Sequence, residues 1–88
     1  MKCALVTGGS RGIGNEICKK LAADTDYHIL INYQANKAAA EKTLAEVTQL
    51  GATGEILQFD VANFDEVKTV LTNWQAANPN AIVEAIVK

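Results

Sequence analysis

The 88-residue chain has eight basic and ten acidic residues, a formal net charge of −2 at pH 7, and 49% hydrophobic residues. This length supports one small domain with a thin core, and the charge balance offers no basic field for nucleic acid and no cationic face for a membrane. No apolar run approaches the ~18 residues of a membrane span. Because Met1 leads directly into a strand-like segment rather than a signal peptide, we expect a cytoplasmic protein.

The chain opens with a strand, a glycine-rich loop and a helix. Residues 2–7 (KCALVT) predict a buried strand, and the loop follows it. Within 12–23, the four-residue spacing of Ile13, Ile17 and Leu21 predicts a helix with one apolar face.

A second strand and helix come next. Residues 27–33 (YHILINY) are a continuous apolar and β-branched run, typical of a strand covered on both sides. A helix is predicted from an N-cap at Asn36 to Leu50, with Gly51 as its C-terminal stop. Its apolar face would be formed by Ala40, Leu44, Val47 and Leu50.

The remaining segment repeats this order. Residues 54–61 (GEILQFDV) predict a third strand, and Asn63 with Glu66 resembles a capping box that begins a third helix. The apolar face of that helix would be Val67, Val70, Leu71 and Trp74. After a turn at 77–80, residues 81–87 (AIVEAIV) predict a fourth strand.

The alternation of strands and helices predicts an α/β fold. We expect a Rossmann-like, doubly wound parallel sheet in three layers (α/β/α), with strand order 3-2-1-4. Residues 1–88 would form only its first βαβαβαβ portion, a dinucleotide-binding half-domain. The fourth strand would then be an open edge and a single helix would cover one face, which favours the N-terminal part of a longer enzyme or a deliberate fragment.

The loop VTGGSRGIG at 6–14 points to a bound phosphate group. Gly8 would allow a tight turn, Gly12 a close approach of the backbone to the phosphates, and Gly14 tight packing of the helix on the first strand. The helix N-terminus would add unpaired N–H groups and a partial positive charge. No Lys-Ser or Lys-Thr pair follows the glycines, which excludes a P-loop.

These residues resemble a known family. The run from Thr7 to Gly14 (TGGSRGIG) looks like the TGxxxGIG signature of the classical short-chain dehydrogenases/reductases. Asp60-Val61 is similar to the family's second motif, which implies that the carboxylate binds the adenine and that the backbone near the valine supports the ring. The resemblance implies cofactor contacts at Gly8, Ser10, Arg11, Gly12, Ile13, Gly14, Asp60 and Val61.

Within the family, Asn32-Tyr33 followed by Gln34-Ala35-Asn36 looks most like the 3-oxoacyl-acyl carrier protein reductases. This likeness implies reduction of a 3-oxoacyl thioester to a 3-hydroxyacyl thioester in fatty-acid synthesis. It also implies a substrate linked to acyl carrier protein and a tetrameric parent enzyme. A relative that reduces another carbonyl, and a non-catalytic nucleotide-binding half-domain, remain alternatives.

The expected cofactor is NADP(H). Tyr33 occupies the end of the second strand, where NAD-preferring sites usually place an acidic residue, so no carboxylate would repel a 2′-phosphate. Arg11 could donate charge-assisted bonds to that phosphate, with Lys37 as a second candidate. The alternatives are a solvated loop arginine at Arg11 and an Asp60 that caps the next turn.

We expect no catalytic group and no metal site in this chain. The resemblance implies a Ser…Tyr-xxx-Lys constellation well downstream of the fourth strand. The pair Tyr33 and Lys37 matches Tyr-xxx-Lys literally, but it spans a strand-to-helix turn near the adenosine ribose and is interpreted as chance. Cys3 and Cys18 are expected to be buried small hydrophobes, and His28 to lie at a strand entrance.

Overall fold

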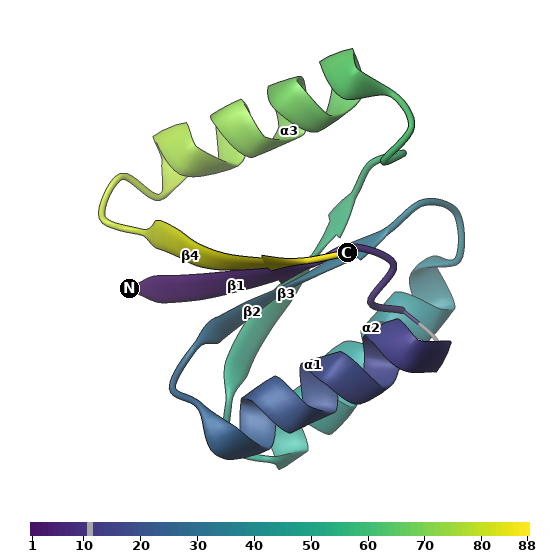
Figure 1. The fold of residues 1–88 in the computed structure, drawn as a ribbon, viewed down its shortest axis with the longest axis vertical. Helices are drawn as coiled ribbons and strands as arrows, with labels where there is room; N and C mark the ends of the chain where they lie inside the picture. Colours follow the sequence, from purple (N-terminus) through teal and green to yellow (C-terminus); the bar gives the residue numbers. More distant parts are fainter. Residues whose placement is uncertain (11) are drawn as a thin grey trace.

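The computed structural model describes residues 1–10 and 12–88. Strands and helices alternate along the chain in the order β1 (Lys2–Val6), α1 (Gly12–Asp24), β2 (His28–Tyr33), α2 (Lys37–Gln49), β3 (Thr53–Gln58), α3 (Phe64–Ala77) and β4 (Ile82–Val87). The strands form one parallel sheet in the order β3-β2-β1-β4. Helices α1 and α2 lie on one face of the sheet and α3 lies on the other (Figure 1). The predicted three-layer fold and strand order are confirmed.

The face under α1 and α2 is closed by small and β-branched side chains. Its buried cluster consists of Val6, Cys18, Ala22, Ile29, Ile31 and Val47. The prediction for the apolar face of α1 is wrong at Ile13, which is 80% exposed. The helix instead buries Cys18 and Ala22, and the small side chains there let it lie close to the sheet, while Ile17 and Leu21 are only partly buried beside them.

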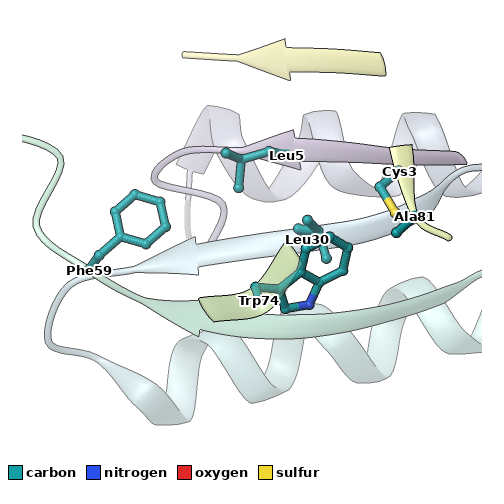
Figure 2. Close-up of a cluster of buried hydrophobic side chains, with 6 residues drawn as sticks. All are labelled: Cys3, Leu5, Leu30, Phe59, Trp74 and Ala81. Carbon is teal, nitrogen blue, oxygen red and sulfur yellow. The ribbon is translucent and has the colours of Figure 1, made fainter. Parts of the chain in front are cut away.

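The opposite face is covered by α3 alone. Its buried cluster contains Cys3, Leu5, Leu30, Phe59, Trp74 and Ala81, shown in Figure 2. The indole Nε1 of Trp74 donates a hydrogen bond to Glu55 Oε1 at 2.9 Å, and Glu55 Oε2 lies 2.9 Å from Nε2 of His28. This chain of contacts connects α3 to β3 and β2, in addition to the apolar contacts.

The predicted N-caps of α2 and α3 are confirmed, with one correction to the capping box. The side chains of Asn36 and Asn63 accept hydrogen bonds from the N–H groups of Ala39 and Glu66, so both are N-caps. The carboxylate of Glu66 accepts from the N–H of Asp60 rather than from that of the N-cap, so the reciprocal bond of a capping box is replaced by a bond to the loop before it.

The end of α2 differs slightly from the prediction. Gly51 has φ +92°, as a C-terminal stop requires, and the Ala52 N–H donates back to the Val47 carbonyl. Leu50 is 47% exposed, however, and does not belong to the apolar face. The buried residues of α2 are Ala40, Thr43 and Val47, so the face includes a threonine that the apolar pattern did not predict.

Strand β3 ends three residues earlier than predicted. Its last paired residue, Gln58, stands opposite Tyr33, the last residue of β2, so no partner strand continues beside residues 59–61.

At the other edge of the sheet, β4 exposes every second residue, including Ile82 and Ile86. In the part of the chain that the structure describes, no helix is long and apolar enough to cross a membrane.

Candidate nucleotide-binding site

A hollow of about 450 Å³ opens at the carboxyl ends of β1, β2 and β3. Ligands of open α/β sheets bind in this position, and the volume falls in the usual range for small-molecule sites. Of the predicted cofactor residues, the structure brings four together here, namely Gly8, Ser10, Tyr33 and Val61. The other described lining residues are Thr7, Asn32, Gln34, Ala35, Asn36 and Phe59, and none of the described lining residues carries a charge.

The glycine loop runs along one side of this hollow. Gly8 and Gly12 have φ of +65° and +61°, a conformation that side chains rarely adopt, and no atom lies within 4 Å of where a Cβ on either would be. A Cβ on Gly14 would overlap the carbonyl oxygen of Gly8. Gly14 therefore brings α1 against the loop after β1, rather than against the strand itself as predicted.

The remaining predicted loop residues stand as follows. Arg11 lies outside the described residues. Gly12, Ile13 and Gly14 begin α1 and do not line the hollow. Their roles as cofactor contacts stay predictions, as does the role of Ser10.

The buried side-chain amide of Asn32 on β2 forms a hydrogen bond with the glycine loop, and the sequence analysis did not predict this role. Asn32 is 2% exposed, and its Oδ1 accepts the Gly8 N–H at 3.1 Å. Its Nδ2 donates to the carbonyl oxygens of Phe59 at 3.0 Å and Leu57 at 3.3 Å. The signal was present in the sequence, because an amide inside the apolar run YHILINY must find partners when it is buried.

A second buried polar side chain, also missed, holds the loop from α2. Thr43 is fully buried, and its hydroxyl donates to the Ser10 carbonyl at 3.0 Å. The same oxygen accepts a hydrogen bond from Asn15 Nδ2 at 2.7 Å. Its signal was the spacing from Ala40 to Thr43 to Val47, which places a hydroxyl on the inward face of the helix.

A thiol lies under the same loop. Cys18 Sγ is 3.9 Å from the Gly9 carbonyl oxygen, and a Cβ on Gly9 would lie 3.1 Å from that sulfur. Burial raises the pKa of the Cys18 thiol to about 12, so this group is protonated and unreactive at neutral pH. Among residues 1–10 and 12–88, no three His, Cys, Asp or Glu side chains are grouped as a metal site would require.

The second motif lies in the loop after β3. One carboxylate oxygen of Asp60 accepts the Ala62 N–H at 2.9 Å, which is the turn-capping alternative, and Asp60 does not line the hollow. Val61 is 59% exposed at its rim. Tyr33 ends β2 and Lys37 begins α2, so this pair spans the predicted strand-to-helix turn.

The site fits a dinucleotide on its own geometry. Any side chain at Gly14 would push α1 away from the loop, so the close approach of helix and loop is built into the sequence. The first turn of α1 contains no acidic residue, and the described residues that line the hollow carry no charge. Such a surface suits an anionic group near the loop and an uncharged base and sugar in the hollow.

Known proteins are similar to this chain in sequence. The sequence model of the family described as short chain dehydrogenase matches residues 2–82. The 3-oxoacyl-[acyl-carrier-protein] reductase FabG of Staphylococcus aureus (strain Mu50) is 41% identical over 70 residues, which are 80% of this chain and 28% of that protein. The Escherichia coli (strain K12) protein named "Uncharacterized oxidoreductase YgfF" is 40% identical over 72 residues, 82% of this chain and 29% of that protein.

Two solved structures are similar in fold. The reductase LugOII, described as catalysing keto-reduction at C1 in lugdunomycin biosynthesis, superposes with a TM-score of 0.82 at 25% identity, over 97% of this chain and 35% of that one. A dehydrogenase from Burkholderia cenocepacia with bound NADP gives a TM-score of 0.79 at 26% identity, over 91% of this chain and 31% of that one. The chain thus spans about a third or less of the length of these proteins.

Proposed function

Because this chain belongs to the short-chain dehydrogenase family, we propose that it forms the NADPH-binding portion of an oxidoreductase that reduces a carbonyl group. The observation that carries the proposal is the position of the hollow. It lies at the carboxyl ends of β1 to β3, beside a glycine loop against which α1 packs through Gly14. When bound, the nicotinamide cofactor supplies the hydride.

The chain's own residues would bind and orient the adenosine and phosphate side of the cofactor. We assign the diphosphate to the loop and first helical turn at Gly8, Ser10, Gly12, Ile13 and Gly14, and the 2′-phosphate to Arg11. Tyr33 would lie against the adenosine ribose, since it lines the hollow at the end of β2. Val61 would support the adenine ring at the rim, and Asp60 would bind it with the carboxylate oxygen not used by the turn.

The preference for NADPH over NADH rests on charge. The end of β2 presents Tyr33 and no carboxylate to the hollow, so no residue of the described lining would repel a 2′-phosphate. The relative from Burkholderia cenocepacia that was solved with NADP supports this choice. Arg11 would supply the positive charge.

Replacing Arg11 tests the cofactor assignment. A bond to a charged group contributes about 1.5–3 kcal/mol, so Arg11→Ala should weaken NADPH binding roughly ten- to a hundredfold and change NADH binding little. Both dissociation constants can be measured by calorimetric titration. Equal losses for the two cofactors would mean that Arg11 only shapes the loop, and Arg11→Lys, which keeps the charge, is the matched control.

The substrate we propose is a 3-oxoacyl thioester carried by acyl carrier protein. Support comes from the relative's name and from the run Asn32-Tyr33-Gln34-Ala35-Asn36. We further propose that residues 1–88 are the N-terminal part of a longer, oligomeric reductase, a tetramer by analogy with the family, whose proton donor lies outside them. The intact mass of the protein tests this, since a value near 9.4 kDa would contradict it. With NADPH, the longer protein should reduce a 3-oxoacyl thioester, and residues 1–88 alone should not.

A further inference from the structure

We propose that Asn32 is a positioning residue that sets the spacing between the two loops that would hold the diphosphate and the adenine of the cofactor. This inference rests on the proposed function and assigns a role to a side chain outside both sequence motifs. The carboxamide of Asn32 uses both of its ends. Its oxygen accepts the N–H of Gly8, in the loop after β1, and its nitrogen donates to the carbonyl of Phe59, in the loop after β3.

Among the described residues, no backbone hydrogen bond joins these two loops to each other directly. Strands β1 and β3 are not neighbours, because β2 lies between them. Backbone hydrogen bonds join each loop separately to β2, from the Gly9 N–H to the Asn32 carbonyl at 3.0 Å and from the Phe59 N–H to the Tyr33 carbonyl at 3.1 Å. Neither of these two bonds reaches from one loop to the other. A side chain near the end of the middle strand can reach both, and Asn32 occupies that position.

The chemistry of the bridge requires an amide. The acceptor faces a backbone N–H on one side and the donor faces the carbonyl oxygens of Leu57 and Phe59 on the other. An aspartate could keep the bond to Gly8 but would place a carboxylate against two carbonyl oxygens. A leucine of similar size could make neither contact, and it would leave these backbone groups without their side-chain partner.

A fixed spacing matters only to a ligand that spans both loops. NADPH would contact the glycine loop with its diphosphate and the Asp60–Val61 loop with its adenine, so its affinity benefits from a spacing that is set before binding. Of these two loops, adenosine would contact only the Asp60–Val61 loop. A defect in the spacing should therefore weaken NADPH binding much more than adenosine binding, whereas a general loss of folded protein would weaken both by one factor.

Thr43 provides the matched control. It and Asn32 are the two buried polar side chains in the described part of the chain, and both hold the glycine loop. Thr43 bonds to the Ser10 carbonyl from α2, and none of its hydrogen bonds goes to the loop after β3. The Thr43→Val variant should loosen one loop without uncoupling the two.

The experiment compares the wild-type protein with Asn32→Leu, Asn32→Asp and Thr43→Val. In Asn32→Leu we expect NADPH to bind at least about tenfold more weakly and adenosine to change by less than about threefold. Amide hydrogen exchange without ligand should become faster at both Gly8 and Ala62. In Thr43→Val, exchange at Ala62 should stay at the wild-type rate.

The Asn32→Asp variant separates the two halves of the bridge. Because this variant keeps the acceptor for the Gly8 N–H, exchange at Gly8 should remain slow while exchange at Ala62 becomes faster. If Asn32→Leu does not fold, Asn32→Asp still tests the inference. Unchanged exchange at Ala62 in Asn32→Leu and Asn32→Asp, or equal losses for NADPH and adenosine, would overturn the inference. If the wild-type protein does not bind NADPH, the proposed function fails, and the exchange data still decide whether Asn32 couples the loops.

Discussion

Helices α1 and α3 both begin at the carboxyl edge of the sheet, after β1 and β3, and their first turns have opposite chemistry. The first turn of α3 contains Asp65 and Glu66, and its N-cap Asn63 accepts the Glu66 N–H. The first turn of α1 has no acidic residue and has glycine at its first and third positions. By position in the helix, Ile13 of α1 corresponds to Asp65 of α3, and Gly14 corresponds to Glu66.

The two helix termini differ in how their partial positive charge is compensated. The partial positive charge of the α3 N-terminus is compensated by its own carboxylates, and Glu66 also bonds to the loop before the helix. At α1 the corresponding positions carry no charge. Its N-terminus is therefore suited to an anion that arrives from solution, because the side chains that would compete with that anion are missing.

The largest effect is expected when Gly14 gains a side chain. Gly14→Ala would drive a methyl group into the Gly8 carbonyl, so α1 or the loop must shift at a cost of about 3 kcal/mol in unfolding free energy. NADPH affinity should fall about a hundredfold or more. Urea denaturation and calorimetric titration measure the two quantities.

Gly51→Ala is the matched control for that variant. Gly51 also has a positive φ, but no atom lies within 4 Å of the place that a Cβ would take, so the change costs only about 1–2 kcal/mol from backbone strain. It should not alter NADPH affinity. A Gly14→Ala protein that is as stable as Gly51→Ala and binds NADPH normally would contradict the close packing of α1 on the loop.

A smaller effect is expected when α1 is given the acidic residue of α3. Ile13 is exposed, so Ile13→Asp should fold normally and gain a little helix stability, while the carboxylate repels the diphosphate and weakens NADPH binding about tenfold. Ile13→Asn has the same shape without the charge and should bind like the wild type. The difference in NADPH affinity between Ile13→Asp and Ile13→Asn should shrink as the salt concentration is raised. Equal affinities at low salt would mean that the diphosphate does not lie near the first turn of α1.

The smallest effect is expected at the cap of α3. Asn63→Ala removes the acceptor for the Glu66 N–H and should lower the unfolding free energy by about 1 kcal/mol. NADPH affinity should change less than about threefold, because this helix terminus is structural. Asn63→Ser keeps a capping oxygen and should restore most of the stability. A large loss of affinity with little loss of stability would show that the α3 terminus belongs to the binding site.

The sequence predicted the elements well because each depends on local spacing. Apolar runs of strand length, the caps Asn36 and Asn63 and the stop at Gly51 act over a few residues, and these predictions are confirmed except at the end of β3. Ile13 was placed wrongly because a four-residue spacing does not say how far along a helix its apolar face is covered.

The candidate site was only partly predictable. Its glycines follow from the motif, because backbone conformation depends on residue type. Asn32 and Thr43 act through partners that are distant in the sequence, on Gly8, Phe59 and Ser10, and only the assembled sheet brings these groups together. The early end of β3 has a similar cause, since it is set by where its neighbour β2 stops.

The bond from Trp74 to Glu55 gives the protein a built-in optical reporter. Trp74 is the only tryptophan in the chain, and it lies between α3 and the sheet with its indole N–H on β3. Its fluorescence therefore monitors the seating of α3, on the face away from α1 and α2. A red shift in emission that precedes the loss of helical circular dichroism would mark a state in which α3 has left the sheet while the other helices remain in place.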